Sequence, residues 1–174
     1  TQGFPGECPP SPLLCLTANT NSSRTFKNKI MKLCTHDILL LQETHITHTT
    51  TGEGDTNIDR AKDKLKKQGY RSEFPAAAHT TKGGTSGGVA IAWRCDREAH
   101  SVKEITPGRA LSVTITSTIG QIMFVSIYGY VNDTGLTKDL LKSVTTSLCQ
   151  NGKPFIIGGD FNASPEQISS HMHD

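Results

Sequence analysis

In the segment Phe155-Ile-Ile-Gly-Gly-Asp160-Phe-Asn162-Ala-Ser-Pro165, a short apolar run leads into a carboxylate and a carboxamide. The apolar run predicts a strand that leaves a hydrophobic core. If the chain stays extended, its period of two residues sends Asp160 and Asn162 to the same side. An aspartate that accepts a proton and an asparagine that donates a hydrogen bond suit the breaking of a phosphate ester. The alternative is a local role, in which Asp160 opens a turn and Asn162 tolerates an unusual backbone angle.

Further apolar runs predict more strands and several helices around this stretch. The segment 111–116 alternates apolar and polar residues and is followed, after a turn at Gly120, by the apolar run 122–128, which together predict a hairpin. Continuous apolar runs predict buried strands at 13–17, 38–42 and 89–93, and helical spacing predicts helices at 26–34, 58–67 and 136–148. Strands interleaved with helices predict a single α/β domain, and the continuously apolar strands predict sheets covered on both faces.

The composition indicates a globular chain without a strong electrostatic signature. The 174 residues are 34% hydrophobic and 20% charged, and the net charge of +2 is too small to indicate nucleic-acid binding by itself. The five cysteines are odd in number and lack Cys-x-x-Cys spacing, which argues against a zinc site or a disulfide framework and favours a reducing compartment inside the cell, nucleus or cytoplasm. No apolar run approaches the roughly 20 residues of a membrane-spanning helix, so we expect no membrane span.

Polar side chains follow the carboxyl ends of four predicted strands. They are Asn19 and Asn21, Gln42 and Glu43, Tyr128 and Asn132, and Asp160 and Asn162. Strand ends hold side chains rigidly while the loops beyond them can vary, so sites are commonly built at such a rim. Singly, each residue could equally satisfy a neighbouring backbone group. As a set they offer carboxylate, amide and phenol oxygens, which favour a hard cation such as Mg²⁺ or Mn²⁺.

The glycine-rich segment 83–88 does not predict a phosphate-binding loop. It lacks the Gly-Lys-Ser/Thr ending of such loops and precedes a predicted strand instead of a helix. We expect this segment to be a loop that permits close approach of the backbone to its neighbours.

Four segments, taken in order, resemble the endonuclease/exonuclease/phosphatase superfamily, and most closely its branch of LINE-type retrotransposon endonucleases and AP endonucleases. They are Asp37-Ile-Leu-Leu-Leu-Gln-Glu43-Thr-His45, Gly87-Gly-Val-Ala-Ile91, Ser126-Ile-Tyr128-Gly and Gly159-Asp160-Phe-Asn162. Each motif is weak alone, but their order and spacing match the superfamily from about residue 13 to about residue 165. The resemblance implies a four-layer α/β sandwich, with two face-to-face sheets between helices, as the buried strands also favour.

The resemblance implies roles for the candidate residues in an in-line displacement at phosphorus. Glu43 would ligate Mg²⁺ or Mn²⁺, with help from Asn19. Tyr128 would donate a hydrogen bond to a phosphate oxygen. Asp160 would orient or deprotonate the attacking water, and Asn162 would bind the phosphate or the nucleophile.

Asn21 and Asn132 are candidate phosphate contacts that depart from the pattern of the superfamily. Asn132 comes one residue later than the Tyr-x-Pro-Asn pattern places it, and the proline is absent. The first strand ends in Thr-Ala-Asn-Thr-Asn21, without the glycine of the commoner Asn-x-Asn-Gly.

The length of the chain is a further departure. The remaining strands of the superfamily and its late Asp-His pair would follow residue 165, so we expect residues 13–174 to be the N-terminal part of such a domain, after an extended Pro- and Gly-rich leader at 1–12. His171, His173 and Asp174 come too soon after Asp160 to replace that pair. The 174 residues alone would then be inactive, with an incomplete sheet edge that a protein partner could cover.

Three functions stay open at this point. The first is Mg²⁺-dependent phosphodiester hydrolysis on nucleic acid, most simply DNA, by an endonuclease of retroelement or repair type within a longer catalytic domain. The second is a degenerate, non-catalytic member that serves as a structural subunit of a larger assembly. The third is a phosphatase that acts on small phosphoesters.

Overall fold

The computed structural model describes residues 12–21, 34–47, 57–79 and 85–169. The leader expected at 1–12 and the helix expected at 26–34 lie almost entirely outside these residues. The elements are β1 (Cys15–Asn19), β2 (Ile38–Gln42), α2 (Asn57–Lys67), β3 (Tyr70–Glu73), β4 (Ala78–His79), β5 (Thr85–Ser86), β6 (Val89–Arg94), β7 (Ala99–Thr106), β8 (Ala110–Ser117), β9 (Gly120–Tyr128), α3 (Thr134–Asn151), β10 (Phe155–Asp160) and α4 (Pro165–Ser169). Within the described residues, no helix is both long enough and apolar enough to span a membrane.

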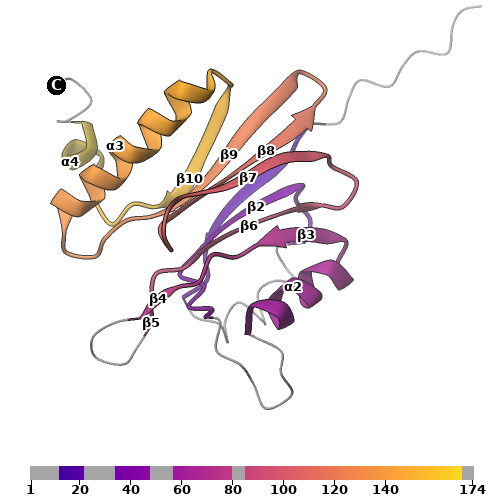
Figure 1. Cartoon of the computed structure of the whole chain (residues 1–174), viewed down its shortest axis with the longest axis horizontal. Coiled ribbons are helices and arrows are strands. Elements are labelled where there is room, and N and C mark those ends of the chain that lie inside the picture. Colours follow the sequence, from indigo (N-terminus) through magenta and orange to yellow (C-terminus); the bar gives the residue numbers. More distant parts are fainter. Residues whose placement is uncertain (1–11, 22–33, 48–56, 80–84, 170–174) are drawn as a thin grey trace, which may run out of the picture.

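Two mixed four-stranded sheets lie face to face (Figure 1). One has the strand order β1-β2-β6-β3 and the other β10-β9-β8-β7, while β4 and β5 form a separate two-stranded ribbon. β1 and β2 run parallel, as do β9 and β10, and the remaining neighbours within the two large sheets are antiparallel. The predicted hairpin is confirmed, since β8 and β9 pair up to the turn at Gly120.

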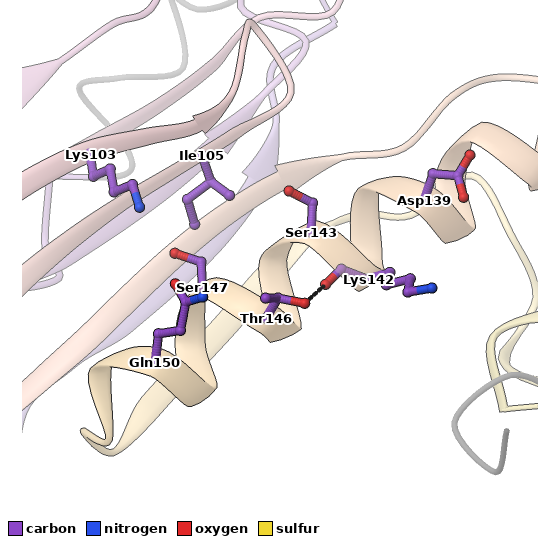
Figure 2. Close-up of a pocket in the computed structure, with 8 residues that line it drawn as sticks. All are labelled: Lys103, Ile105, Asp139, Lys142, Ser143, Thr146, Ser147 and Gln150. Atoms are coloured by element: carbon purple, nitrogen blue, oxygen red, sulfur yellow. Dashed lines mark hydrogen bonds between the residues drawn. The ribbon is translucent and has the colours of Figure 1, made fainter.

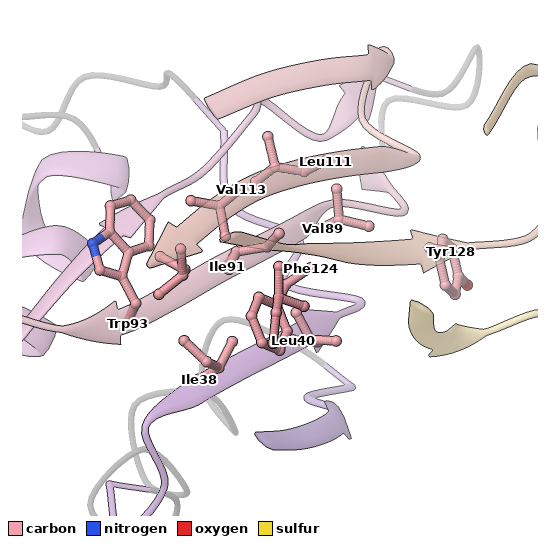
Figure 3. Packing of buried hydrophobic residues seen from close by; sticks show 11 residues of the cluster. Ile38, Leu40, Val89, Ile91, Trp93, Leu111, Val113, Phe124 and Tyr128 are labelled. Carbon is pink, nitrogen blue, oxygen red and sulfur yellow. The ribbon is translucent and has the colours of Figure 1, made fainter. Parts of the chain in front are cut away.

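Alternation along the central strands divides their side chains between the inside and the outside of the sandwich. In β2, Ile38 and Leu40 belong to the apolar layer between the sheets, whereas Leu39 and Leu41 belong to the layer under α2. This is the two-residue period of an extended chain, buried on both faces. Figure 3 shows the layer between the sheets, which also contains Val89, Ile91, Trp93, Leu111, Val113, Ile115, Ile122, Phe124 and Tyr128.

Each outer face is covered by one of the two longer helices (Figure 1). α2 packs Ile58, Ala61 and Leu65 against the β1-β2-β6-β3 sheet, which confirms the apolar face predicted for it. α3 packs Leu140, Val144 and Leu148 against Met123, Val125 and Ile127 of β9. The order helix, sheet, sheet, helix confirms the predicted four-layer α/β sandwich.

The structure corrects the sequence-based expectations at the sheet margins. The first strand lies two residues later than expected, so that Asn19 is its last residue. β3 and β7 were not predicted, because both are polar edge strands. The apolar start of β10 predicted burial, yet Phe155 is 48% exposed and Ile156 is 42% exposed. β10 is the edge strand of its sheet.

Glycines allow the two sheets and their strands to approach closely at β10. A Cβ atom on Gly158 would lie 2.8 Å from Leu40 Cδ1 and 3.1 Å from Thr17 Cβ, both in the opposite sheet. A Cβ atom on Gly159 would lie 2.2 Å from the carbonyl oxygen of Ile127 in the neighbouring strand. The Gly158-Gly159 pair therefore brings the end of β10 against β9 on one side and against β1 and β2 on the other.

Candidate functional site

The polar residues predicted from the sequence meet at the carboxyl ends of the two parallel strand pairs. Asn19 is the register partner of Gln42 at the ends of β1 and β2, and Asp160 is the register partner of Tyr128 at the ends of β10 and β9. Carboxyl ends of parallel strands share one edge of a sheet. Because the sheets also face each other, the two ends form one polar rim, which we define as Asn19, Gln42, Glu43, Tyr128, Asp160 and Asn162.

Asn19 and Asp160 connect the two sheets at this rim. Asn19 Nδ2 donates to Asp160 Oδ2 at 2.9 Å, although the two residues are 141 positions apart in the sequence. Both side chains are half-buried. Since the Asn19 amide holds one carboxylate oxygen in place, the orientation of Asp160 is set by the opposite sheet.

Asp160 and Asn19 each also close a local turn. The backbone N–H of Asn162 donates to Asp160 Oδ1 at 3.1 Å, and that of Asn21 donates to Asn19 Oδ1 at 2.9 Å. Asn162 has φ +48° and Asn21 has φ +56°, a left-handed conformation that asparagine tolerates better than most residues. The local interpretation of Asp160 and Asn162 is therefore confirmed, and it is compatible with a place in a site. The chain does not stay extended after Asp160, so these two residues meet through a turn and not through strand alternation.

Glu43 and Tyr128 form the second connection between the sheets. Tyr128 Oη donates to Glu43 Oε1 at 2.7 Å, and the phenol is 4% exposed. Burial, followed by the hydrogen bond and the negative charge of Glu43, raises the pKa of Tyr128 to about 12. Tyr128 is therefore a neutral phenol at physiological pH. Glu43 has φ +53°, an uncommon backbone conformation for a non-glycine residue.

Gln42 and Ser126 make a buried connection beneath the rim. Gln42 Nε2 donates to Ser126 Oγ at 3.0 Å, and Ser126 Oγ donates to the carbonyl oxygen of Leu41 at 3.0 Å. Thr17 Oγ1 adds a hydrogen bond to Gln42 Oε1 at 3.3 Å. This network fixes how the ends of β2 and β9 face each other.

The Asn162 side chain is bound by the carbonyl group of Gly129, directly after β9. The same carbonyl group binds Arg109, a residue that the sequence did not indicate. Asn162 Nδ2 donates to the carbonyl oxygen of Gly129 at 3.1 Å, and Arg109 Nη1 donates to the same oxygen at 3.1 Å. The Arg109 guanidinium lies 4.9 Å from the ring centre of Tyr128 and 4.4 Å from that of Tyr130. A single arginine in a turn carries no recognisable pattern, so nothing in the sequence singled out Arg109.

A hollow of about 370 Å³ opens at the rim. It is lined by Thr17, Ala18, Asn19, Gln42, Gly159, Asp160, Phe161, Asn162 and Ala163. Of the predicted site residues, Glu43, Tyr128 and the candidate phosphate contacts Asn21 and Asn132 do not line it. The side chains of Asn21 and Asn132 are exposed, and Asn132 lies in the turn that precedes α3.

A second hollow, of about 450 Å³, lies between β7 and α3 (Figure 2). It is lined by Lys103, Ile105, Asp139, Lys142, Ser143, Thr146, Ser147 and Gln150. Asp139 is its single carboxylate, and none of the residues predicted for a site lies there. The rim therefore remains the candidate site.

The residues of the rim fit a hard divalent cation. Glu43 Oε1 accepts the Tyr128 hydrogen, which leaves Glu43 Oε2 available. The Asn19 side chain is bonded to Asp160 through its amide nitrogen, and its amide oxygen accepts the N–H of Asn21. Among the described residues, no three Asp, Glu, His or Cys side chains gather as a metal site. One or two carboxylates completed by an amide oxygen and waters are the ligands that Mg²⁺ takes in proteins, whereas Zn²⁺ sites use more His and Cys.

Solved structures similar to this chain share its fold. The endonuclease domain of TRAS1, a telomere-specific non-LTR retrotransposon, is 18% identical, with a TM-score of 0.60 over 93% of this chain and 68% of that one. An endonuclease/exonuclease/phosphatase family protein from Leptotrichia buccalis is 19% identical, with a TM-score of 0.65 over 93% and 71%. A humanized TDP2 from D. rerio is 14% identical, with a TM-score of 0.60 over 91% and 65%.

Sequence comparison adds the family. No curated protein sequence matches the chain. The profile of the Endonuclease/Exonuclease/phosphatase family matches residues 16–173, which include every residue of the polar rim. This chain belongs to the Endonuclease/Exonuclease/phosphatase family.

Proposed function

We propose that this chain is part of a longer catalytic domain that hydrolyses phosphodiester bonds of nucleic acid as a Mg²⁺-dependent endonuclease. The observation that carries the proposal is the pairing of Asn19 with Asp160 and of Tyr128 with Glu43, which places two carboxylates from opposite sheets at one open rim. Proteins of the family are hydrolytic phosphoesterases in general. A retrotransposon endonuclease domain is among the similar folds, which supports nucleic acid as the substrate class.

Glu43 and the side-chain oxygen of Asn19 would hold the cation, Mg²⁺ or Mn²⁺. When bound, the cation supplies positive charge that offsets the charge developing on the phosphate oxygens. Glu43 oxygens are ordered for this role by Tyr128, whose hydroxyl fixes one of them.

Asp160 is the residue that would orient the attacking water or take its proton. Asn19 Nδ2 and the backbone N–H of Asn162 hold one carboxylate oxygen each, so the carboxylate is aligned before substrate arrives. Such pre-alignment lowers the cost of reaching the reacting geometry.

Asn162 and Tyr128 would contact the phosphate. Asn162 uses one N–H for the carbonyl oxygen of Gly129, so its second N–H is available to a substrate oxygen. Tyr128 gives its single hydroxyl hydrogen to Glu43, so donation to a phosphate requires that this bond be exchanged when substrate binds. Asn21 and Asn132 remain proposed contacts to more distant phosphates.

A plasmid-nicking assay of the full-length protein with Mg²⁺ tests the proposal. We expect nicking that depends on the metal and falls about 10²- to 10⁴-fold in Asp160→Ala. Asp139→Ala, which removes an exposed carboxylate on α3, is the matched control and should nick like the wild type. Absence of nicking by the wild type would refute the endonuclease proposal, and equal nicking by Asp160→Ala would refute the site assignment.

The phosphatase alternative is separated by the substrate in the same assay series. Hydrolysis of p-nitrophenyl phosphate without nicking would favour a phosphatase. DNA affinity that falls steeply with salt would favour the nuclease, because phosphate contacts release counterions. Failure of both reactions, with the protein folded, would favour the non-catalytic alternative.

A further inference from the structure

Arg109 is a charged residue in a buried position. It is 9% exposed and lies in the turn directly before β8. Burial of a cation is costly unless partners replace its water. The partners of this cation therefore indicate why an arginine stands at this position.

Three consecutive residues at the end of β9 and directly after it, 128–130, are partners of Arg109. The guanidinium stacks over the rings of Tyr128 and Tyr130, at 4.9 Å and 4.4 Å from their centres. Its Nη1 donates at 3.1 Å to the carbonyl oxygen of Gly129, the residue between them. The backbone of Arg109 also binds this segment, since its carbonyl oxygen accepts a 2.8 Å hydrogen bond from the N–H of Tyr128. One side chain thus holds three consecutive residues.

Two residues of the rim depend on the same segment. Asn162 Nδ2 donates to the Gly129 carbonyl oxygen that Arg109 also binds, and Tyr128 Oη donates to Glu43. Gly129 lies too close to the residue after β10 to carry a side chain, because a Cβ atom on it would lie 2.0 Å from the carbonyl oxygen of Phe161. The planar guanidinium can stack and donate at once, which a lysine ammonium cannot do in this geometry.

We propose that Arg109 is a positioning residue of the rim, which fixes the 128–130 segment so that the Gly129 carbonyl orients Asn162 and the Tyr128 hydroxyl reaches Glu43. Its effect on catalysis rests on the proposed function, whereas its effect on Asn162 does not. Arg109 itself does not touch the candidate substrate position. Its action passes through the carbonyl group and the phenol ring.

The chain offers a matched control for this proposal. Arg94 stacks over the ring of Tyr70 at 4.9 Å, the same distance that separates Arg109 from the Tyr128 ring. Tyr70 and Arg94 lie in β3 and β6, at the opposite end of β6 from the rim. Arg94→Met removes an equivalent stack without touching the site.

The test compares Arg109→Met, Arg109→Lys and Arg94→Met in the full-length protein. The first readout is the NMR spectrum of the Asn162 side-chain amide. We expect its resonances to shift in both Arg109 variants and to stay unchanged in Arg94→Met. Unchanged Asn162 resonances in a folded Arg109→Met protein would overturn the proposal, whether or not the protein is a nuclease.

The second readout is nicking, measured where thermal melts show each variant to be folded. We expect kcat to fall about 10- to 100-fold in Arg109→Met with KM nearly unchanged. In the double variant with Asn162→Ala the two losses should not add, because both act through the same amide. Strictly additive losses, or full activity in both Arg109 variants, would contradict the proposal.

Tyr130→Leu provides a second variant if Arg109→Met does not fold. It removes one of the two stacked rings and leaves the arginine in place. We expect the same Asn162 shift, smaller in size, and an unaltered spectrum would count against positioning by the stack. If the wild-type protein does not nick DNA, the proposed function fails while the NMR comparison still decides the role of Arg109.

Discussion

The two ends of the layer between the sheets are built from the same strands but hold together differently. At one end apolar side chains such as Ile38 and Trp93 pack between the sheets (Figure 3). At the other end the sheets are joined by hydrogen bonds between side chains. Apolar contact is strong but has no preferred direction, whereas a hydrogen bond requires a specific geometry. We infer that the apolar end contributes most of the stability and that the hydrogen bonds of the polar rim align the two sheets. Substitutions at the two ends should therefore separate these properties.

The largest effect is expected from the apolar layer. Phe124 is fully buried between the sheets, so Phe124→Ala should lower the free energy of unfolding by about 3–5 kcal/mol through lost burial and a residual cavity. Urea denaturation measures this loss. The control Phe155→Ala, at a side chain that is 48% exposed, should cost much less. Equal losses would mean that the layer between the sheets is not the main source of stability.

A smaller loss is expected where the apolar layer meets the rim. Gly158→Ala would push a methyl group against Leu40 and Thr17, and overpacking of this kind costs about 1–3 kcal/mol. In the control Gly135→Ala, a glycine of α3 with only an ordinary contact gains helix propensity and should stabilise by about 0.5–1 kcal/mol. Thermal unfolding of both variants measures the contrast, and a destabilisation by Gly135→Ala as large as that by Gly158→Ala would contradict the close approach.

The buried connection beneath the rim should contribute less. Gln42→Met keeps the volume of the side chain but removes its hydrogen bonds to Ser126 and Thr17, so we expect a loss of about 1 kcal/mol. Ser126→Ala should remove part of the same energy. A double-mutant cycle measured by urea denaturation would show coupling of at least about 0.5 kcal/mol. Full additivity would show that the two side chains do not act together.

The smallest effect at neutral pH concerns the charge state of Tyr128, because its pKa shift makes stability vary with pH only in the alkaline range. Its pKa is about 12 in the folded protein, above the ordinary value of 10, because burial and Glu43 favour the neutral phenol. The corresponding stabilisation is fully present below pH 10 and is lost as the pH rises through 12. Burial also raises the pKa of Tyr70, so a spectrophotometric tyrosine titration should show a late absorbance change that is reduced, and not abolished, in Tyr128→Phe. A transition near pH 10 assigned to Tyr128 would contradict the buried pair.

The central strands could be predicted because burial leaves a pattern in the sequence. β2, β6 and β9 each contain an apolar run, since both of their faces are covered. β3 and β7 could not be found, because edge strands are paired on one side and carry residues such as Arg71 and Lys103 that favour no single structure. For β10 the sequence predicted too much burial, since the apolar residues at its start are half-exposed.

The members of the candidate site could be predicted, but their pairing could not. Strand ends identified Asn19, Glu43, Tyr128 and Asp160, and resemblance gave their roles. The pairs Tyr128–Glu43 and Asn19–Asp160 join residues that are 85 and 141 positions apart in the sequence. These pairs depend on how the two sheets face each other, and no local sequence pattern indicates that arrangement. Arg109 was missed for the same reason, because its importance lies entirely in contacts made by the folded chain.

Binding of a single Mn²⁺ ion, followed by electron paramagnetic resonance, tests most directly whether the rim is a cation site. The wild-type protein should bind one ion, and Glu43→Gln should lose that binding while its melting curve shows a folded protein. Glu98→Gln, at an exposed carboxylate of the same chain, should bind like the wild type. Undiminished Mn²⁺ binding by Glu43→Gln would contradict the account, because the pairing of the two sheets would then serve something other than a metal.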